Sequence, residues 1–172
     1  MGDNFTLDLA DERATLQFGQ AMAQAIKPGV CVFLQGNLGA GKTTFVRGFL
    51  EGLGFHGKVK SPTYTLLESY EISQENGLIV TVNHFDLYRF NDDEEWEAAG
   101  FREAFNPQSV CLIEWPEKAA HTLPTPDIEI ELTMQPMPEN LSVGRLAKVQ
   151  GLSVRGKMVC DAWQGELKKG SV

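Results

Sequence analysis

The first third of the chain alternates between helix-like and strand-like apolar patterns. Apolar residues at intervals of three or four predict a helix over residues 11–26, and a short apolar run predicts a strand over 30–34. A glycine-rich segment, 36–41, follows, and a second helix is expected over 42–53, with Gly54 as its natural stop. The residues that define the two apolar helix faces are Ala14, Phe18, Met22 and Ala25, and then Val46, Phe49, Leu50 and Leu53.

The remainder of the chain favours strands with short connections. The patterns predict strands over 63–72, 78–85, 109–113, 127–134 and 146–154, and helical segments over 92–99, 116–120 and 155–163. A turn at 74–77 makes the first two of these strands an antiparallel hairpin. Residues 135–140, with two prolines, are expected to be a loop, and the polar segment 165–172 to be a frayed tail.

This order of elements predicts the fold class. A strand, a glycine loop, a helix and then further strands indicate a three-layer α/β domain of the P-loop type, in which the hairpin makes the sheet mixed rather than wholly parallel. The chain has 172 residues, of which 42% are hydrophobic and 22% charged, as in an ordinary globular protein. We therefore expect a single domain over residues 1–164.

Charge and cysteine usage narrow the possible partners and the compartment. The formal net charge is −8, so we do not expect this chain alone to bind RNA or DNA directly, although a partner protein can bind the nucleic acid instead. No apolar stretch approaches the length of a membrane span, and the acidic start of the chain lacks the apolar core of a secretion signal. Cys31, Cys111 and Cys160 are far apart and are expected to be small core residues of a cytoplasmic protein.

The glycine-rich segment matches a phosphate-binding motif at each fixed position. Residues 36–43, GNLGAGKT, fit the pattern G-x-x-x-x-G-K-[ST]. Glycines let backbone N–H groups turn inward around a phosphate, the following helix adds the positive end of its dipole, and the lysine and hydroxyl suit outer phosphates and Mg²⁺. The motif predicts that the nucleotide is ATP with Mg²⁺. The residues expected to contact it are Asn37, Leu38, Gly39, Ala40, Gly41, Lys42, Thr43 and Thr44.

Such a site also needs a carboxylate for the metal and for the attacking water. Asp86 and Glu114 each end an apolar strand and can face the glycine loop, but their spacing does not tell metal ligand from water-orienting base. Ser61, Pro62 and Thr63 precede a predicted strand, and their hydroxyls suit a segment that senses the γ-phosphate. From position alone, a turn before strand-favouring threonines is the simpler interpretation of that segment.

Four ordered motifs together resemble the bacterial TsaE family, also called YjeE. They are GNLGAGKTTFVRGFL, SPTYTLLESY, HFDLYRF and LIEWPEKA, and the resemblance extends from about Phe5 to Met134, with little of it in 135–172. Members are small P-loop ATPases that support formation of threonylcarbamoyladenosine (t6A) at position 37 of certain tRNAs. They act with TsaD and TsaB, the pair that transfers the threonylcarbamoyl group. We further expect this chain to hydrolyse ATP weakly without such partners, because a switch ATPase needs its partner to order the site.

The resemblance implies a role for each matching residue. Asp86 matches the functional aspartate of the family, and Glu114 matches its Walker-B-like acid. Trp115 is expected either to line the nucleotide site or to be a core or surface aromatic. Lys42, Asp86 and Glu114 are thus the expected catalytic residues, and Thr43, Asp86 and Glu114 the expected metal ligands. The segment that matches the switch-I-like region of the family consists of Ser61, Pro62, Thr63 and Thr65.

Three other functions are compatible with a phosphate loop. A small-molecule kinase needs an arginine-bearing lid, and although Arg89 and Arg102 are available, the sequence shows no lid-like arginine cluster. A GTP-dependent switch is disfavoured because the Asn-Lys-x-Asp guanine signature is missing. A nucleotide-binding assembly factor without significant turnover stays open, and multiple-turnover phosphate release distinguishes it from an ATPase.

Overall fold

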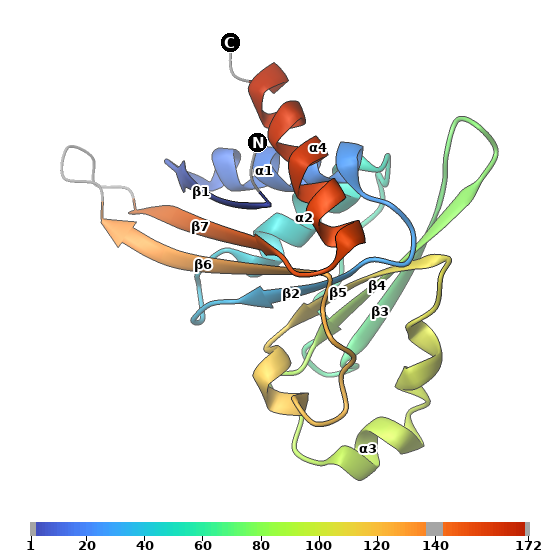
Figure 1. Ribbon diagram of the computed structural model, residues 1–172. Helices are drawn as coiled ribbons and strands as arrows, with labels where there is room; N and C mark the ends of the chain where they lie inside the picture. Colours follow the sequence, from blue (N-terminus) through green and yellow to red (C-terminus); the bar gives the residue numbers. More distant parts are fainter. Residues whose placement is uncertain (1–2, 137–142, 171–172) are drawn as a thin grey trace.

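A computed structural model describes residues 3–136 and 143–170 and shows one seven-stranded sheet with helices on both faces (Figure 1). The strand order is β1-β7-β6-β2-β5-β4-β3. The elements in chain order are β1 Asn4–Leu9, α1 Glu12–Ala25, β2 Cys31–Gln35, α2 Lys42–Gly52, β3 Leu67–Ser73, β4 Ile79–Asp86, α3 Asp93–Ala98, η1 Phe101–Ala104, β5 Ser109–Glu114, η2 Pro116–Ala119, β6 Ile128–Pro136, β7 Val143–Gly151 and α4 Val154–Gly170.

The sheet is mixed, which confirms the predicted class. Strand β2 pairs in parallel with β5 on one side and β6 on the other, and β4 pairs in parallel with β5. The pairs β1–β7, β6–β7 and β3–β4 are antiparallel. Strand β2 therefore lies at the centre, as expected of the strand that leads into a phosphate loop.

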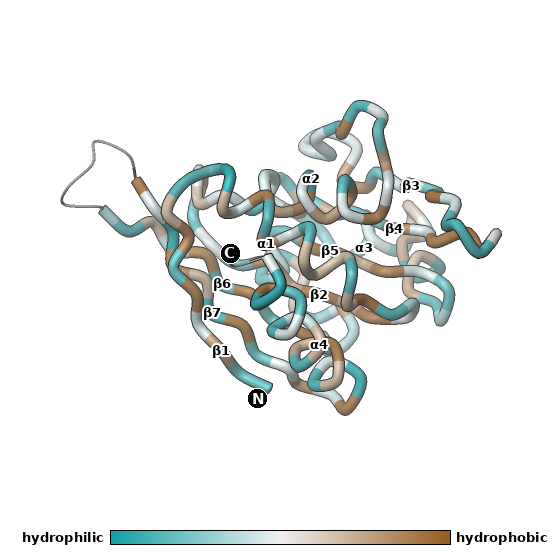
Figure 2. The backbone as a smooth tube through the Cα atoms, turned by 90° about the horizontal axis from the view of Figure 1, so that it is seen from above, coloured by the Kyte–Doolittle hydropathy of each residue, from teal (hydrophilic) through white to brown (hydrophobic). Residues whose placement is uncertain are grey.

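The alternation of side chains along the central strands builds the two outer layers. Val32 and Leu34 of β2 face a core that also contains residues of α1, α2 and α4. Cys31 and Phe33 face the opposite way, into a second cluster that includes Trp96 of α3. The predicted three layers are thus present, and Figure 2 shows apolar residues running along the strands while many peripheral connections are polar.

Local signals explain where the first helix begins. Asp11 is the N-cap of α1, and its side chain accepts a hydrogen bond of 2.8 Å from the N–H of Ala14. Glu12 adds a negative charge to the first turn, where the helix dipole favours it. Farther along, Phe18 of α1 stacks on Trp163 of α4 with ring centroids 4.6 Å apart, so the two helices share one core.

Two elements were not predicted, and one predicted boundary in the first half of the chain is wrong. Strand β1 was not predicted, and it lies at the sheet edge, paired with β7. The strand predicted over 63–72 begins only at Leu67, because residues 63–66 form a turn closed by the Leu66 N–H on the carbonyl of Pro62. The 3₁₀ segment η1 was also not predicted.

The second half differs from prediction at both ends of the β6–β7 hairpin. Strand β6 continues through Gln135 and Pro136, which were expected to be loop, while 137–140 lie outside the described residues. Pro136 is the last residue of its strand and lies beyond the part of β6 that pairs with β2, which ends at Glu131. Strand β7 begins at Val143 instead of residue 146, and it ends at Gly151, short of the predicted residue 154.

The final helix is longer than its sequence pattern suggested. Helix α4 extends from Val154 to Gly170, beyond the predicted end at residue 163, and residues 171–172 lie outside the described part. Leu167 is partly buried against the main core, and Lys169 pairs with Glu166 at 3.1 Å. These contacts hold in helical form most of the segment that was expected to be a frayed tail.

The three cysteines are free and buried, as predicted. Burial raises the pKa of the Cys111 thiol to about 12 and that of Cys160 to about 11, so both stay protonated near neutral pH. Within the described residues, none of the helices combines the length and apolarity that a membrane crossing requires.

Candidate functional site

The central strand and the helix after it place the glycine loop at the carboxyl end of the sheet. Residues 36–41 connect β2 to α2, and β5 and β6 flank β2 on its two sides. Ligands of open α/β sheets bind at this end of the strands. The loop therefore lies where the fold class predicts a binding site.

Two glycines of the loop are required by its geometry. A Cβ at Gly36 would lie 2.6 Å from the carbonyl oxygen of Leu132, a contact that no side chain can make. Gly41 has a left-handed φ of 102° and is the N-cap of α2, which begins at Lys42 without a side-chain cap. The uncapped first turn leaves backbone N–H groups to an anionic ligand, and the helix dipole favours negative charge there.

The side chain of Lys42 turns back toward the glycine loop that precedes this residue. Its side chain is almost buried, and its Nζ donates a hydrogen bond to the carbonyl of Gly36. The same Nζ is 3.5 Å from the centroid of the Trp115 ring, a cation–π distance. Burial lowers the pKa of Lys42, and the nearby carboxylates of Glu114, Glu117 and Asp86 oppose that change.

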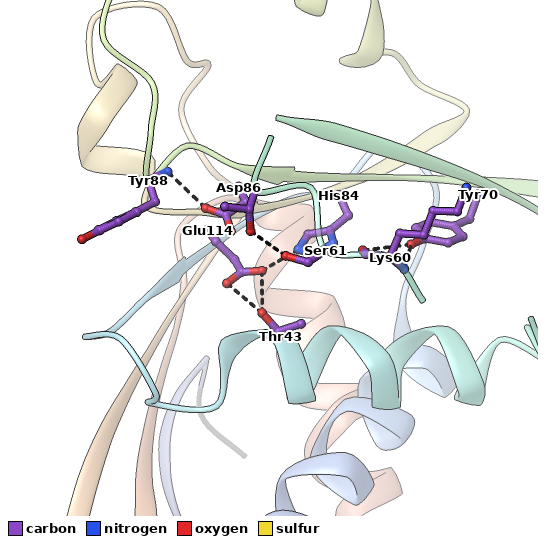
Figure 3. Close-up of polar contacts among 9 residues, drawn as sticks. Thr43, Lys60, Ser61, Tyr70, His84, Asp86, Tyr88 and Glu114 are labelled. Carbon is purple, nitrogen blue, oxygen red and sulfur yellow. Dashed lines mark hydrogen bonds and ion pairs between the residues drawn. The ribbon is translucent and has the colours of Figure 1, made fainter. Parts of the chain in front are cut away.

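Side-chain alternation brings the two predicted acids to one face of the sheet. Asp86 ends β4 and shares a face with Val82, while Glu114 ends β5 and shares a face with Leu112. Both apolar residues pack into the core that holds α2. The carboxylates therefore point toward the helix that begins at the glycine loop (Figure 3).

The acids make different contacts. The hydroxyl of Thr43 lies 3.3 Å from both carboxylate oxygens of Glu114. Asp86 accepts a hydrogen bond of 3.1 Å from the N–H of Tyr88, and the structure gives it no bond to Thr43. Only Glu114 thus touches the residue whose hydroxyl suits a metal in a phosphate loop.

The imidazole of His84 contacts the carboxylate of Glu114. Its Nε2 lies 2.6 Å from a carboxylate oxygen of Glu114, and both side chains are buried. Among the described residues, the Nδ1 of His84 has no hydrogen-bond partner. This pair was not predicted, although His84 stands two residues before Asp86 in the HFDLYRF motif, and period-2 alternation would have placed both on one face.

The environment of Asp86 disfavours its charge. Burial raises the pKa of Asp86 above its ordinary value of 3.8, and the charge of Glu114 adds to the rise. The Tyr88 N–H, His84 and Lys42 act in the opposite direction. A carboxyl group with a raised pKa near a phosphate loop is a recognised feature of catalytic sites.

A cleft of about 640 Å³ unites most of the predicted residues. Besides the loop and the two acids, it is lined by Ser61 and Thr63, whose hydroxyls lie 2.7 Å apart. Pro62 is buried, and Thr65 instead contacts Glu68 at 3.3 Å and does not line the cleft. Asn37 does not line it either, and its carbonyl accepts the N–H of Ala40 within the loop.

Trp115 combines the two interpretations that the sequence left open. It is half-buried, packs partly against the second apolar cluster and also lines the cleft. Of the two arginines considered for a lid, Arg89 lines the cleft and lies over the Tyr64 ring at 4.8 Å. Arg102 pairs with Glu97 on the surface and does not line the cleft.

Seven residues of the cleft wall were not among the predicted site residues. They are Asp11, Glu12 and Thr15 around the start of α1, Tyr88 and Arg89 after β4, and Val143 and Arg145 of β7. The HFDLYRF motif could have indicated Tyr88 and Arg89, which follow directly after Asp86. The other five are brought to the loop by tertiary packing and carry no local signal.

The donor set fits a magnesium–nucleotide complex better than a free metal. Among the residues that the structure describes, no cluster of three His, Cys, Asp or Glu side chains is able to hold a metal ion. Mg²⁺ usually binds proteins through one or two carboxylates together with substrate phosphates. Thr43, Glu114 and Asp86 supply such an incomplete set beside an anion-binding loop.

Comparisons with known proteins agree with this geometry. The family model described as threonylcarbamoyl adenosine biosynthesis protein TsaE matches residues 9–141. The chain is similar to the tRNA threonylcarbamoyladenosine biosynthesis protein TsaE of Haemophilus influenzae, with 44% identity over 76% of this chain and 82% of the relative. For the protein of the same name from Bacillus subtilis the identity is 40%, over 67% of this chain and 69% of the relative.

A solved structure shows the same architecture over nearly the whole chain. The crystal structure of Bacillus subtilis YdiB superposes with a TM-score of 0.72 and 27% identity, covering 96% of this chain and 97% of YdiB. The superposition therefore includes β7 and α4, which follow the last residue matched by the family model.

Proposed function

Because the chain belongs to the TsaE family and is a P-loop nucleotide-binding protein, we propose that it binds and hydrolyses Mg-ATP in support of t6A formation on tRNA. The observation that carries this proposal is the contact of the Thr43 hydroxyl with both oxygens of Glu114, directly beside an uncapped helix start. The relatives named as tRNA threonylcarbamoyladenosine biosynthesis proteins supply the pathway.

The loop residues bind and neutralise the phosphates. Residues 38–44 line the cleft, and their backbone N–H groups, other than that of Ala40, which donates to Asn37, compensate the charge of the β- and γ-phosphates together with the ammonium group of Lys42. Trp115 keeps that ammonium group in place through the ring face against which it lies. Mg²⁺, when bound with the nucleotide, neutralises charge that develops on the phosphate oxygens.

We assign different roles to the two acids. Glu114 contacts Thr43, so these two residues would hold the metal, with Asp86 nearby. Asp86 has no such contact and accepts a hydrogen bond from the attacking water, orienting it toward the γ-phosphorus. The water oxygen forms the new bond to phosphorus, the bridging P–O bond breaks, and ADP and inorganic phosphate are the products.

We further propose that hydrolysis acts through TsaD and TsaB. Ser61 and Thr63 lie at the cleft on a turn between α2 and β3, so loss of the γ-phosphate changes the ligand that this turn faces. The net charge of −8 supports contact with tRNA only indirectly, through that pair of partners. The three free, buried thiols support a reducing, cytoplasmic location.

Reconstitution of t6A formation tests this function. Repeated modification of tRNA by TsaD and TsaB should require this chain and ATP beyond the ATP used to make the threonylcarbamoyl donor. A preformed donor removes that first requirement, and a non-hydrolysable ATP analogue should then stop turnover. Full turnover with the analogue favours a nucleotide-binding assembly factor, and transfer of labelled γ-phosphate to a metabolite favours a small-molecule kinase.

A further inference from the structure

The outer wall of the phosphate loop is built by the β6–β7 hairpin. The carbonyl of Leu132 lies against Gly36, and Cε of Met134 lies 3.1 Å from the position of a Cβ on Gly39. Met134 and Arg145 are direct cross-strand partners. The hairpin thus contacts the loop at its first glycine, Gly36, and again at Gly39.

Arg145 makes the most specific of these contacts. Its Nε donates a hydrogen bond of 2.9 Å to the carbonyl of Ala40, and its Nη2 donates one of 2.9 Å to the carbonyl of Gly39. Its Nη1 bonds to the carbonyls of Val143 and Gly144 at 2.9 and 3.0 Å. One guanidinium group therefore ties two loop carbonyls to two carbonyls of its own strand.

These bonds have a consequence for the opposite side of the loop. A peptide plane whose carbonyl is held toward β7 presents the N–H of the next residue in the opposite direction. The plane held through the Ala40 carbonyl carries the N–H of Gly41, next to the first turn of α2. The plane held through the Gly39 carbonyl carries the N–H of Ala40, which donates to the carbonyl of Asn37 within the loop. An arginine fork suits this task because its donors are fixed in one plane and its charge is permanent.

We propose that Arg145 is a positioning residue that holds the phosphate loop in its anion-binding conformation before the nucleotide arrives. This inference rests on the proposed function, since it assumes that the loop binds Mg-ATP. It also extends the nucleotide site to a strand that begins after residue 141, the last residue matched by the family model. The ligand whose binding Arg145 would strengthen is a nucleoside di- or triphosphate, because the loop segment that Arg145 positions is the part proposed to bind the phosphates.

Calorimetry on three substitutions of Arg145 tests the proposal. Arg145→Met keeps the aliphatic stem, Arg145→Ala removes it, and Arg145→Lys keeps the charge with a single ammonium group. We expect Arg145→Met and Arg145→Ala to weaken Mg-ATP and Mg-ADP binding by about ten- to a hundredfold. Lys148→Ala, which removes an exposed cation from the same strand, is the matched control and should change the affinity less than about twofold.

Hydrogen exchange of the ligand-free protein provides a readout that a general loss of stability does not reproduce. In Arg145→Met, the amides of residues 37–41 should exchange faster, while those of β2 and β5 keep their wild-type rates. This measurement also keeps the proposal testable if Arg145→Ala does not fold. Faster exchange throughout the sheet would instead show a merely structural role and overturn the proposal.

Two affinity results would also overturn it. Wild-type affinity in Arg145→Met would show that the carbonyl contacts do not prepare the loop. Wild-type affinity in Arg145→Lys would show that charge alone matters. If the wild-type chain itself binds no Mg-ATP, the proposed function fails, and that result is distinct from a failure of Arg145 to matter.

Discussion

Asp86 and Glu114 lie directly opposite each other in the parallel pairing of β4 with β5, yet only Glu114 touches Thr43. Parallel register places their Cα atoms side by side, and the shared face directs both carboxylates at the start of α2. The two acids therefore belong to one site but meet different atoms. We therefore assign Glu114 to the metal and Asp86 to the attacking water.

Neutral isosteres of the two acids should affect magnesium differently. We expect Asp86→Asn and Glu114→Gln each to slow ATP hydrolysis by about 10²–10⁴-fold, with a much smaller loss of ATP binding. In Glu114→Gln, chelation of Mg²⁺ should change nucleotide affinity less than in the wild type, because the metal has already lost a ligand. Asp86→Asn should keep the wild-type dependence on Mg²⁺.

Binding titrations with and without a chelator, together with phosphate release, check this assignment. Asp8→Asn, on the exposed side of β1, is the matched control and should behave as wild type. The reverse pattern, with Asp86→Asn insensitive to Mg²⁺, would exchange the two roles. Normal hydrolysis by Asp86→Asn would remove that residue from the mechanism.

Asp86→Asn should also stabilise the fold at neutral pH. The pKa of Asp86 is raised in the folded protein, so the folded state holds this proton more tightly than the unfolded chain does. Stability contributed by this group is therefore lost as pH rises from near 3.8 through the folded pKa. Asparagine carries no such cost and can still accept the Tyr88 N–H.

Thermal unfolding at several pH values measures this effect. At pH 7 we expect the melting temperature of Asp86→Asn to exceed that of wild type, because the variant has no buried charge at this position. The difference should shrink on acidification, since the wild-type carboxyl is then protonated as well. A lower melting temperature at pH 7, with Asp8→Asn unchanged, would contradict the buried and destabilised charge.

His84 should matter for both stability and hydrolysis. His84→Ala removes the bond to Glu114 in a buried setting and should cost about 1–3 kcal/mol of unfolding free energy. It should also slow hydrolysis, because Glu114 loses the group that orients it. His84→Gln restores an amide donor and should recover part of both quantities. Urea unfolding and phosphate release are the measurements, and a wild-type hydrolysis rate in His84→Ala would exclude the orienting role.

Trp115 should report nucleotide binding by its fluorescence. Of the three tryptophans, Trp96 and Trp163 are fully buried, while Trp115 lines the cleft beside Lys42. Addition of Mg-ATP should therefore change the emission of the wild type, and Trp115→Phe should abolish most of that change. Trp115→Phe should still bind nucleotide in calorimetry. An unchanged signal in this variant would place the responding tryptophan elsewhere.

Much of the site could be predicted because its signals are local. The motif at 36–43 requires its glycines, lysine and threonine within eight consecutive residues, and the flanking apolar runs identify β2 and α2. Asp86 and Glu114 could be named because each directly follows an apolar run. Their adjacency could not, since it depends on the register of β4 against β5.

The missed parts depend on long-range contacts or on overlooked alternation. Arg145 meets Ala40 across 105 positions of the chain, and no spacing rule connects them. Strand β1 did carry a signal, since Phe5, Leu7 and Leu9 alternate with polar residues. Thr63 and Thr65 favour a strand by their β-branched side chains, but the turn closed on Pro62 overrides that preference.

Phosphate release under multiple turnover tests directly whether this chain hydrolyses Mg-ATP at the glycine loop. Wild type and Lys42→Ala are compared with Mg-ATP, in the presence of TsaD and TsaB. We predict that wild type releases several equivalents of phosphate and that Lys42→Ala falls to background, since the ammonium group at Gly36 and Trp115 is lost. Equal phosphate release by Lys42→Ala and wild type would contradict this prediction.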